Sequence, residues 1–264
     1  MKKVMRKSIG KTKARTAKQS ADAPSAVEAL VAFIDLLGFS DRVLAVRSID
    51  ELGRLVDSIR RVRDHFDYQP SDPMTREAQR LSKTEVLAFS DCVVLSIGLK
   101  SPVTEAQGEF DTWGSDLLIM AHVQAVSVTS GHFLRGGVDK GLWYHDPAGI
   151  LVSPALVQAY KLEQTAKYPV LAISNSLCEF LRNHPGRKFY SQDLDPFPRM
   201  FRHFKGPSRK VIRYLNYIEL VLNDLDWQYD RDTIRAYRVA TQEARDAIAR
   251  EGYRKNVVRF FRNQ

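Results

Sequence analysis

Cysteines are scarce in this chain of 264 residues: it has only Cys92 and Cys178, which form neither a disulfide framework nor a C-x-x-C pair. No apolar run approaches the roughly 18 residues of a membrane-spanning helix, and no apolar segment of a secretory signal follows the basic N-terminus. These absences exclude a small disulfide-stapled fold and favour a cytoplasmic protein. Cys92 lies in an apolar, strand-like run, where we expect an ordinary buried thiol.

Acidic residues are missing from the first 20 positions, which hold eight lysines and arginines. The whole chain has 40 basic and 31 acidic residues and a net charge of +9, of which this segment supplies +8, so the remainder is nearly neutral. We expect a basic, disordered tail over residues 1–27. It is either a solvated leader or a segment that touches RNA or an anionic membrane, and it lacks the interleaved aromatic residues of a base-stacking surface.

With 44% hydrophobic residues, the chain can bury a substantial core. The following list gives the elements that apolar periodicity and turn residues predict. The strands cover 30–36, 83–98 as a hairpin that turns at Ser90-Asp91, 132–145 as two strands joined by a glycine kink, and 168–174; the helices cover 48–66, 110–131, 152–166 and 174–181; a polar loop covers 67–80.

The order of these elements is β-α-β-β-α-β, which predicts an α+β fold with a ferredoxin-like, palm-type core. We place this core over residues 28–200 and a C-terminal helical extension over 201–264. The segments KVIRYLNYIELVLNDL and DTIRAYRVATQEARDAIAREGYRKNVVRFF combine charge with helical apolar spacing. We expect this extension to pack on the sheet or on a second subunit.

Two aspartates interrupt apolar segments at corresponding places. Asp35 ends the first strand, within VAFIDLLGFSDRV, and Asp91 lies in the hairpin turn. Since the first strand and the hairpin are neighbours in this topology, the two carboxylates should converge at one end of the sheet. Carboxylates a few ångströms apart repel each other unless a cation lies between them. Hard divalent ions prefer such oxygen ligands, and two of them suit in-line displacement at a phosphate.

The turn after the first aspartate adds phosphate-binding character. Leu37, Gly38, Phe39 and Ser40 can offer backbone N–H groups to a triphosphate, and glycine permits a close backbone approach. Arg135, on a later strand, supplies a guanidinium fork that suits phosphate oxygens. Each feature alone is equally typical of an ordinary turn or cap. Their combination predicts a site for a metal-bound nucleotide.

Four segments, FIDLLGFSD, LAFSDCVVLS, FLRGGVDKG and SPALVQAYKLE, resemble the motifs of class III nucleotide cyclases in their family order. The resemblance implies that Asp35 and Asp91 hold two divalent ions, Mn²⁺ or Mg²⁺, with the Leu36 carbonyl helping. It implies that the turn over 37–40 and Arg135 hold the triphosphate. The implied reaction is attack of a ribose 3′-OH on the α-phosphate with release of pyrophosphate. Members of the family work as homodimers with sites built across the interface.

The positions that read a purine base in this family are apolar here, at Leu87 and near Ile150. Glu85 or Lys83 would restore a polar reader if the register slipped by two residues. Loss of both readers predicts a different base, because a site built to hydrogen-bond one base rejects another. The pattern is similar to the bacterial Pycsar-type pyrimidine cyclases, which make cyclic UMP or cyclic CMP in antiphage defence and act with a separate effector protein that senses the product. Between the two substrates we favour UTP.

The short helix also departs from the family. Val157 and Lys161 stand where an asparagine and a transition-state arginine are expected, and Gln158 and Lys161 are the nearest substitutes. Lysine supplies positive charge as a point rather than a fork. The alternatives are therefore a cytidylate cyclase, a purine cyclase with rearranged base contacts, and a degenerate cyclase-like module that binds nucleotide without turning it over.

Overall fold

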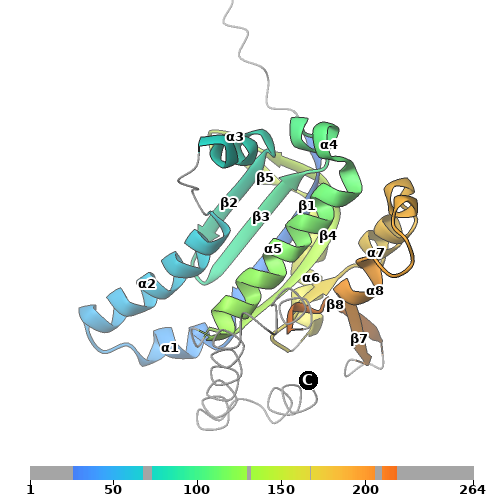
Figure 1. The fold of residues 1–264 in the computed structure, drawn as a ribbon. Helices are drawn as coiled ribbons and strands as arrows, with labels where there is room; N and C mark the ends of the chain where they lie inside the picture. The colour runs from blue at the N-terminus through green and yellow to red at the C-terminus, as the bar shows by residue number, and fades with distance from the viewer. Residues whose placement is uncertain (1–25, 68–72, 130–131, 167, 206–209, 219–264) are drawn as a thin grey trace, which may run out of the picture.

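The computed structural model describes residues 26–67, 73–129, 132–166, 168–205 and 210–218 (Figure 1). Its elements follow in the order β1 (Val27–Leu36), α1 (Phe39–Ala45), α2 (Ile49–Phe66), α3 (Pro73–Leu81), β2 (Thr84–Phe89), β3 (Cys92–Gly98), α4 (Pro102–Gln107), α5 (Glu109–Thr129), β4 (Leu134–His145), β5 (Leu151–Val152), α6 (Pro154–Ala166), β6 (Leu171–Ile173), α7 (Asn175–Arg182), the 3₁₀ helix η1 (Pro185–Phe189), α8 (Phe197–Met200), β7 (Phe201–Lys205) and β8 (Val211–Leu215). No helix in these described ranges is long and apolar enough to cross a membrane.

One sheet joins the strands in the order β2-β3-β1-β4-β6-β8-β7, and β5 pairs with β4 beside this path. The pairs β2–β3, β3–β1 and β1–β4 are antiparallel, whereas β4 and β6 are parallel. This is the strand order of a ferredoxin-like β-α-β-β-α-β unit, so the predicted α+β fold and the position of the hairpin next to the first strand are confirmed.

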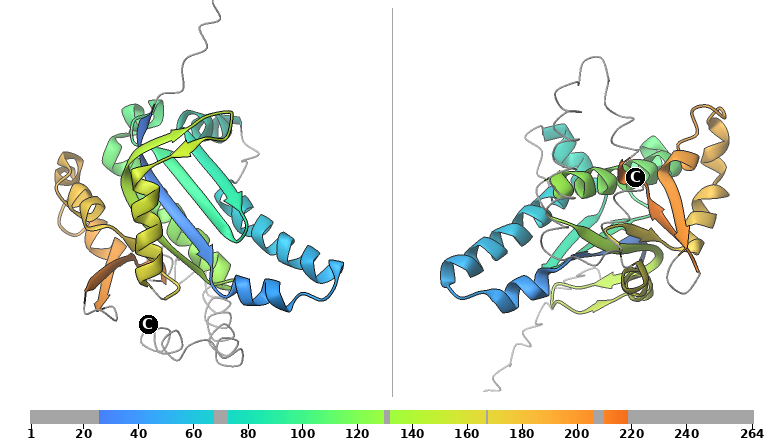
Figure 2. Two further views of the ribbon diagram at one scale, coloured as in Figure 1. Left: turned by 180° about the vertical axis from the view of Figure 1, so that it is seen from behind. Right: turned by 90° about the horizontal axis from the view of Figure 1, so that it is seen from below.

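The strand β1 is buried on both faces of the sheet, under a large core cluster on one face and a smaller one on the other. Successive side chains of a strand point to opposite faces. Leu30, Ala32 and Ile34 therefore belong to the large core under α2 and α5. Ala29, Val31 and Phe33 belong to a smaller cluster under α6. Figure 2 shows α6 over the β4 side of this second face, and no described helix covers β2 and β3 there.

The paired glycines of β4 lie inside one continuous strand, so the predicted kink between two strands is wrong. A Cβ on Gly137 would lie 2.1 Å from the Ala159 carbonyl oxygen of α6, and a Cβ on Gly136 would lie 2.5 Å from the Phe33 carbonyl oxygen of β1. The glycines let the backbones of α6 and β1 approach β4 closely. This close approach fixes the position of α6 against the sheet.

Helix starts were predicted well. Ser48 caps α2 by accepting from the Glu51 N–H at 3.2 Å, and Ser153 accepts from the Leu156 N–H of α6 at 3.1 Å, with Pro154 as the first helical residue. The turn between β2 and β3 lies at Ser90-Asp91 as predicted.

Two predicted segments differ from the structure. The loop expected over 67–80 contains the helix α3. The helix expected from residue 210 onward begins instead with the strand β8, which pairs with β6 and with β7. Those two pairings outweigh the helical spacing of the local sequence, because tertiary contacts override propensity. The other helices predicted for 201–264 and residues 1–25 of the expected tail over 1–27 lie outside the described residues, whereas Val27 belongs to β1.

Candidate active site

Asp35 and Asp91 meet at one end of the sheet, as predicted. In the β1–β3 register Asp35 lies opposite Cys92, the residue after Asp91. The Leu36 N–H donates to the Asp91 carbonyl oxygen at 3.2 Å, which ties the hairpin turn to the end of β1. Carboxylate oxygens of the two aspartates and the Cys92 sulfur all lie within 4.8 Å of one another. Ser90 reaches this arrangement with a φ of 54°, a left-handed conformation that non-glycine residues seldom adopt.

The turn after β1 is formed around a left-handed glycine. Gly38 has a φ of 78° and a ψ of 10°, a region in which residues with a Cβ are strained, and it stands directly before α1. The Leu37 N–H donates to the Phe133 carbonyl oxygen at 2.8 Å, which anchors the turn to the start of β4. Of the four residues predicted to bind phosphate, Leu37 therefore already uses its N–H. Phe39 fixes the start of α1 by burying its side chain in the main core.

Arg135 lies beside Asp35 in the neighbouring strand. Its Nη2 donates to Asp35 Oδ2 at 3.0 Å, across the β1–β4 pair. The same nitrogen forms an ion pair with Glu163, a buried acid of α6. One guanidinium thus serves two carboxylates, while a third, that of Asp91, is close by. The positive charge predicted to face a triphosphate compensates protein carboxylates in this structure.

Two acids of the site, Asp35 and Glu163, have raised pKa values. Burial, the largest effect, raises the pKa of Asp35 to about 6. The negative charges of Asp91 and Glu163 contribute to this increase, and Arg135 offsets part of it. Burial also raises the pKa of Glu163. The Cys92 thiol has its pKa raised to about 12 by burial and by the two aspartates, so it stays protonated, as expected for an ordinary thiol.

The donor set fits a hard divalent ion. The carboxylates of Asp35, at the end of β1, and of Asp91, in the turn before β3, stand together, and the negative charge of Asp91 is one cause of the raised pKa of Asp35. Oxygen ligands suit Mg²⁺ or Mn²⁺, and the Leu36 backbone carbonyl follows Asp35 directly. The protonated sulfur of Cys92 is a poor ligand for such an ion, which leaves Asp35 and Asp91 as the metal-binding pair.

The residues expected near the base are apolar and partly exposed. Leu87, on β2, packs against the smaller core cluster, and Ile150 is 57% exposed in the loop before β5. The polar alternative, Glu85, is already engaged: it accepts from Trp143 Nε1 at 3.3 Å and contacts His145 Nδ1 at 2.9 Å. The register slip that would make Glu85 a base reader is therefore disfavoured by its contacts.

Lys161 faces a different cavity from the two aspartates. It is exposed on α6 and lines a space of about 390 Å³ with Asp139, Ser174 and Arg213. Neither Asp35 nor Asp91 lines that space. The structure of a single subunit therefore does not bring the predicted transition-state cation to the carboxylate pair.

Sequence reasoning missed Glu163. The signal was present in the spacing of α6, because Ala155, Ala159 and Glu163 recur every four residues and are all buried. A carboxylate on the buried stripe of a helix needs a cation, and Arg135 is that cation.

Comparisons with known proteins give only distant likenesses. No family model matches the chain, and no curated protein matches it. One similar solved structure is the adenylyl cyclase CyaB from P. aeruginosa, with 14% identity and a TM-score of 0.43 over 73% of this chain and 95% of that one. A second is the monomeric guanylyl cyclase domain of the RhoGC fusion protein from the aquatic fungus Blastocladiella emersonii, with 14% identity and a TM-score of 0.46 over 73% of this chain and 96% of that one. A third is a class III adenylyl cyclase-like ATP-binding protein from Pseudomonas aeruginosa, with 12% identity and a TM-score of 0.45 over 85% of this chain and 44% of that one. Because every one of these TM-scores is below 0.5, the fold assignment above rests on strand order and register alone.

Proposed function

We propose that this protein is a nucleotide cyclase that converts UTP into 3′,5′-cyclic UMP and pyrophosphate with two divalent ions. The observation that supports this most is the convergence of the Asp35 and Asp91 oxygens within 4.8 Å, directly before the turn at Gly38. Two carboxylates at a strand end, with an arginine beside them and a glycine turn after them, suit the binding of a metal-bound triphosphate.

Each residue has a proposed role. Asp35, Asp91 and the Leu36 carbonyl hold the ions, which when bound make the ribose hydroxyl more acidic and neutralise the triphosphate. The backbone of Gly38, Phe39 and Ser40 receives the phosphates. Leu37 positions this turn through its hydrogen bond to β4.

Arg135 contacts the triphosphate once its hydrogen bond to Asp35 is replaced by hydrogen bonds to phosphate oxygens. This exchange is feasible because cations that bind between Asp35 and Asp91 reduce the need of Asp35 for a protein partner. The ion pair of Glu163 with Arg135 is retained and holds the guanidinium in place, so Glu163 acts as a positioning residue. Lys161 supplies the remaining positive charge from the partner subunit.

The base is proposed from the apolar character of its surroundings. Leu87 and Ile150 offer no hydrogen-bonding group to a purine edge, and Glu85 is occupied by Trp143 and His145. A pyrimidine suits such a site better, with UTP before CTP; the alternatives are a cytidylate cyclase and a purine cyclase. In line with the resemblance, we propose that the product is a second messenger in antiphage defence, read by a separate effector protein.

A homodimer would complete the site. Large apolar side chains are exposed on β2 and on α6: Phe89 by 53%, Val157 by 52% and Tyr160 by 49%. Lys161 lines a cavity that neither aspartate of its own subunit lines, which supports a role for it in the site of a partner subunit. Gel filtration of active protein should give a dimer, and Phe89→Glu should yield an inactive monomer. A fully active monomer would contradict the composite site.

One observation favours a second candidate function. The ion pair of Arg135 with Asp35 occupies a proposed metal ligand, as expected of a cyclase-like module that binds nucleotide without turning it over. The test for both candidates is incubation of the full chain with ATP, GTP, CTP or UTP and Mn²⁺ or Mg²⁺, followed by chromatography. Cyclic UMP supports the proposal, turnover of ATP or GTP alone rules out the pyrimidine assignment, and binding without any turnover supports the module.

A further inference from the structure

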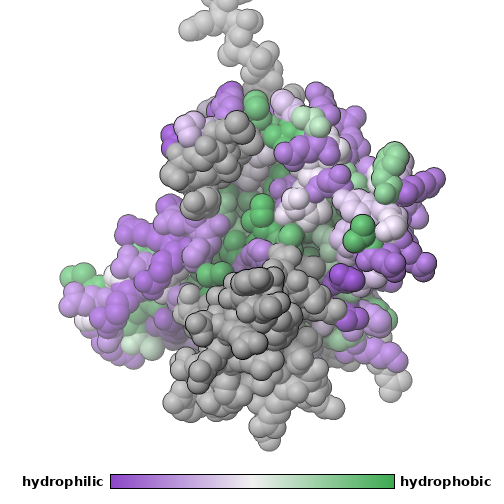
Figure 3. All heavy atoms as spheres, viewed as in Figure 1, coloured by the Kyte–Doolittle hydropathy of each residue, from purple (hydrophilic) through white to green (hydrophobic). Residues whose placement is uncertain are grey.

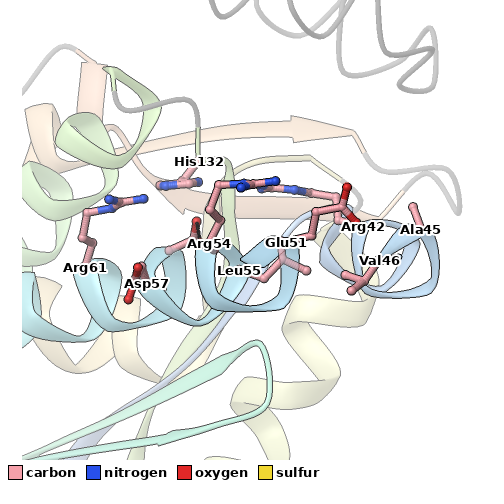
Figure 4. Close-up of a pocket in the computed structure, with 10 residues that line it drawn as sticks. Arg42, Ala45, Val46, Glu51, Arg54, Leu55, Asp57, Arg61 and His132 are labelled. Atoms are coloured by element: carbon pink, nitrogen blue, oxygen red, sulfur yellow. Dashed lines mark hydrogen bonds between the residues drawn. The ribbon is translucent and has the colours of Figure 1, made fainter. Parts of the chain in front are cut away.

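A second polar pocket is separate from the candidate active site, since neither Asp35 nor Asp91 lines it. It has a volume of about 590 Å³ and lies between α1, α2 and His132, two residues before β4 (Figure 4). Four basic side chains line it: Arg42 from α1, Arg54 and Arg61 from α2, and His132. Hydrophilic residues gather along α2 on the molecular surface (Figure 3), so this pocket is part of a polar face and not of the apolar dimer face proposed above.

The three arginines are not neutralised by the acids of the pocket. Glu51 accepts from the Arg47 backbone N–H at 2.6 Å, and Asp57 pairs with Arg60 at 3.4 Å. Within the described part of the chain, Arg42, Arg54 and Arg61 make no ion pair. A concave surface with three uncompensated guanidinium groups attracts anions and orients them through paired N–H donors.

His132 provides an independent sign of a missing ligand. Its Nδ1 is buried and has no hydrogen-bond partner among the described residues, and buried polar atoms of this kind are normally satisfied. Burial lowers the pKa of His132, and the charges of Arg42, Arg61 and His65 lower it further. An anion bound beside the ring would reverse these charge effects and could accept a hydrogen bond from it.

We propose that this pocket binds a small molecule that carries two or more linked phosphate groups. Arg54 and Arg61 are seven residues apart on α2, which separates them by about 10 Å along the helix axis. In Figure 4 the nitrogen-bearing ends of Arg61, His132, Arg54 and Arg42 stand in a row and do not converge on one point. A row of donors matches a chain of phosphates better than it matches a single phosphate.

The shape of the pocket favours a small ligand over a nucleic acid. The cationic groups are confined to one hollow, and Glu51 and Asp57 bound it on the α2 side. A nucleic-acid groove would need a basic stripe that continues along the surface. This second site is independent of the cyclase reaction, because none of its lining residues belongs to the proposed catalytic machinery.

The test is titration of the full chain with inorganic triphosphate in EDTA, followed by calorimetry and by the imidazole NMR signals of His132. EDTA removes the divalent ions on which binding at Asp35 and Asp91 depends. We expect the doubly substituted variant Arg54→Gln, Arg61→Gln to weaken binding at least about tenfold, the loss expected when charge-assisted contacts worth roughly 1.4 kcal/mol are removed. Arg63→Gln, a matched charge removal on α2 outside the pocket where Arg63 pairs with Asp64, should change it less than about threefold.

Because the substituted arginines are exposed on α2, both variants should fold, and Arg42→Gln on α1 gives a second test. Triphosphate should shift the His132 signals in the native chain and leave them unshifted in the double variant. Absence of binding, or binding that survives in the double variant, would overturn the proposal. So would a single-stranded oligonucleotide that displaces triphosphate and loses its own binding in the double variant, because the site would then belong to a nucleic acid.

Discussion

Arg135 Nη2 donates to Asp35 Oδ2 at 3.0 Å across the β1–β4 pair, and the same nitrogen contacts Glu163 of α6. This one guanidinium joins the strand that carries the first aspartate, its neighbour in the sheet, and the helix packed on them. All three side chains are largely buried, with exposures of 22%, 16% and 1%. The stability of the site and its readiness to accept a cation both depend on this arrangement.

Replacement of Arg135 by glutamine should destabilise the protein. The substitution leaves Asp35 and Glu163 buried without a cation, and loss of one partner from a buried pair typically costs about 3 kcal/mol. Urea unfolding at pH 7 measures the change in the free energy of unfolding. Arg60→Gln, which removes only an exposed pair with Asp57, serves as the control and should have little effect. Equal effects of the two substitutions would show that the Arg135 pairs contribute no more than a surface contact.

Asp35→Asn should alter the pH dependence of stability. The pKa of Asp35 is raised from 3.8 to about 6 in the folded protein, so between these values the folded state keeps a proton that the unfolded chain releases. Stability contributed by this group is therefore full below about pH 4 and is lost as the pH rises to about 6. The variant has no carboxyl group at this position and so does not lose this stability. Its free energy of unfolding relative to that of the native chain should therefore rise by about 3 kcal/mol from pH 4 to pH 7.

Unfolding of both proteins at several pH values checks this prediction. The comparison cancels the contribution of Asp116, whose pKa burial raises to about 7 and which is present in both chains. A difference between the two proteins that stays constant from pH 4 to pH 7 would mean that Asp35 ionises normally.

Added Mn²⁺ should stabilise the native chain more at pH 7.5 than at pH 5. A cation between Asp35 and Asp91 binds the ionised carboxylates, and at pH 5 it must displace a proton from Asp35. Thermal unfolding with increasing Mn²⁺ gives the shift in the midpoint at each pH. Asp91→Ala should remove most of the shift at pH 7.5. A shift that is independent of pH and survives this substitution would place the ion elsewhere.

Gly137→Ala should loosen α6 from the sheet. Its Cβ would lie 2.1 Å from the Ala159 carbonyl oxygen and 2.6 Å from Leu162 Cβ, and overpacking of this kind costs about 1–3 kcal/mol. Gly53→Ala is the matched control, because nothing lies within 4 Å of its new Cβ in α2 and alanine favours a helix by about 1 kcal/mol. Thermal unfolding should therefore move in opposite directions for the two variants. A Gly137→Ala protein as stable as the native chain would show that α6 can move away from β4 at little cost in stability.

Much of the core and of the site could be predicted from local patterns. The alternation of β1, the turn at Ser90-Asp91 and the cap at Ser153 are local signals, and the topology they define brings Asp35 next to Asp91. The proximity of Arg135 to Asp35 depends on the register of β4. Sequence placed Arg135 on the correct strand but did not reveal that it pairs with Glu163.

Two of the wrong predictions share a physical cause, because each depends on contacts distant in sequence. The glycine pair of β4 was interpreted as a kink, since nothing local indicates that α6 and β1 press against it. The strand β8 was interpreted as a helix, since its pairing with β6 and β7 outweighs its local spacing. The active-site role of Lys161, assigned from its position in a motif, stays a prediction; in the described subunit the residue lines another cavity.

The central claim is that Asp35 and Asp91 together support metal-dependent cyclisation. It is tested most directly by incubating the native chain, Asp35→Ala and Asp91→Ala with UTP and Mn²⁺, and by measuring cyclic UMP and pyrophosphate. The native chain should release the two products in equal amounts, and each variant should lose at least about a hundredfold in rate, as expected when a metal ligand is removed, while remaining folded by circular dichroism. Near-normal rates in either folded variant would contradict the two-carboxylate assignment.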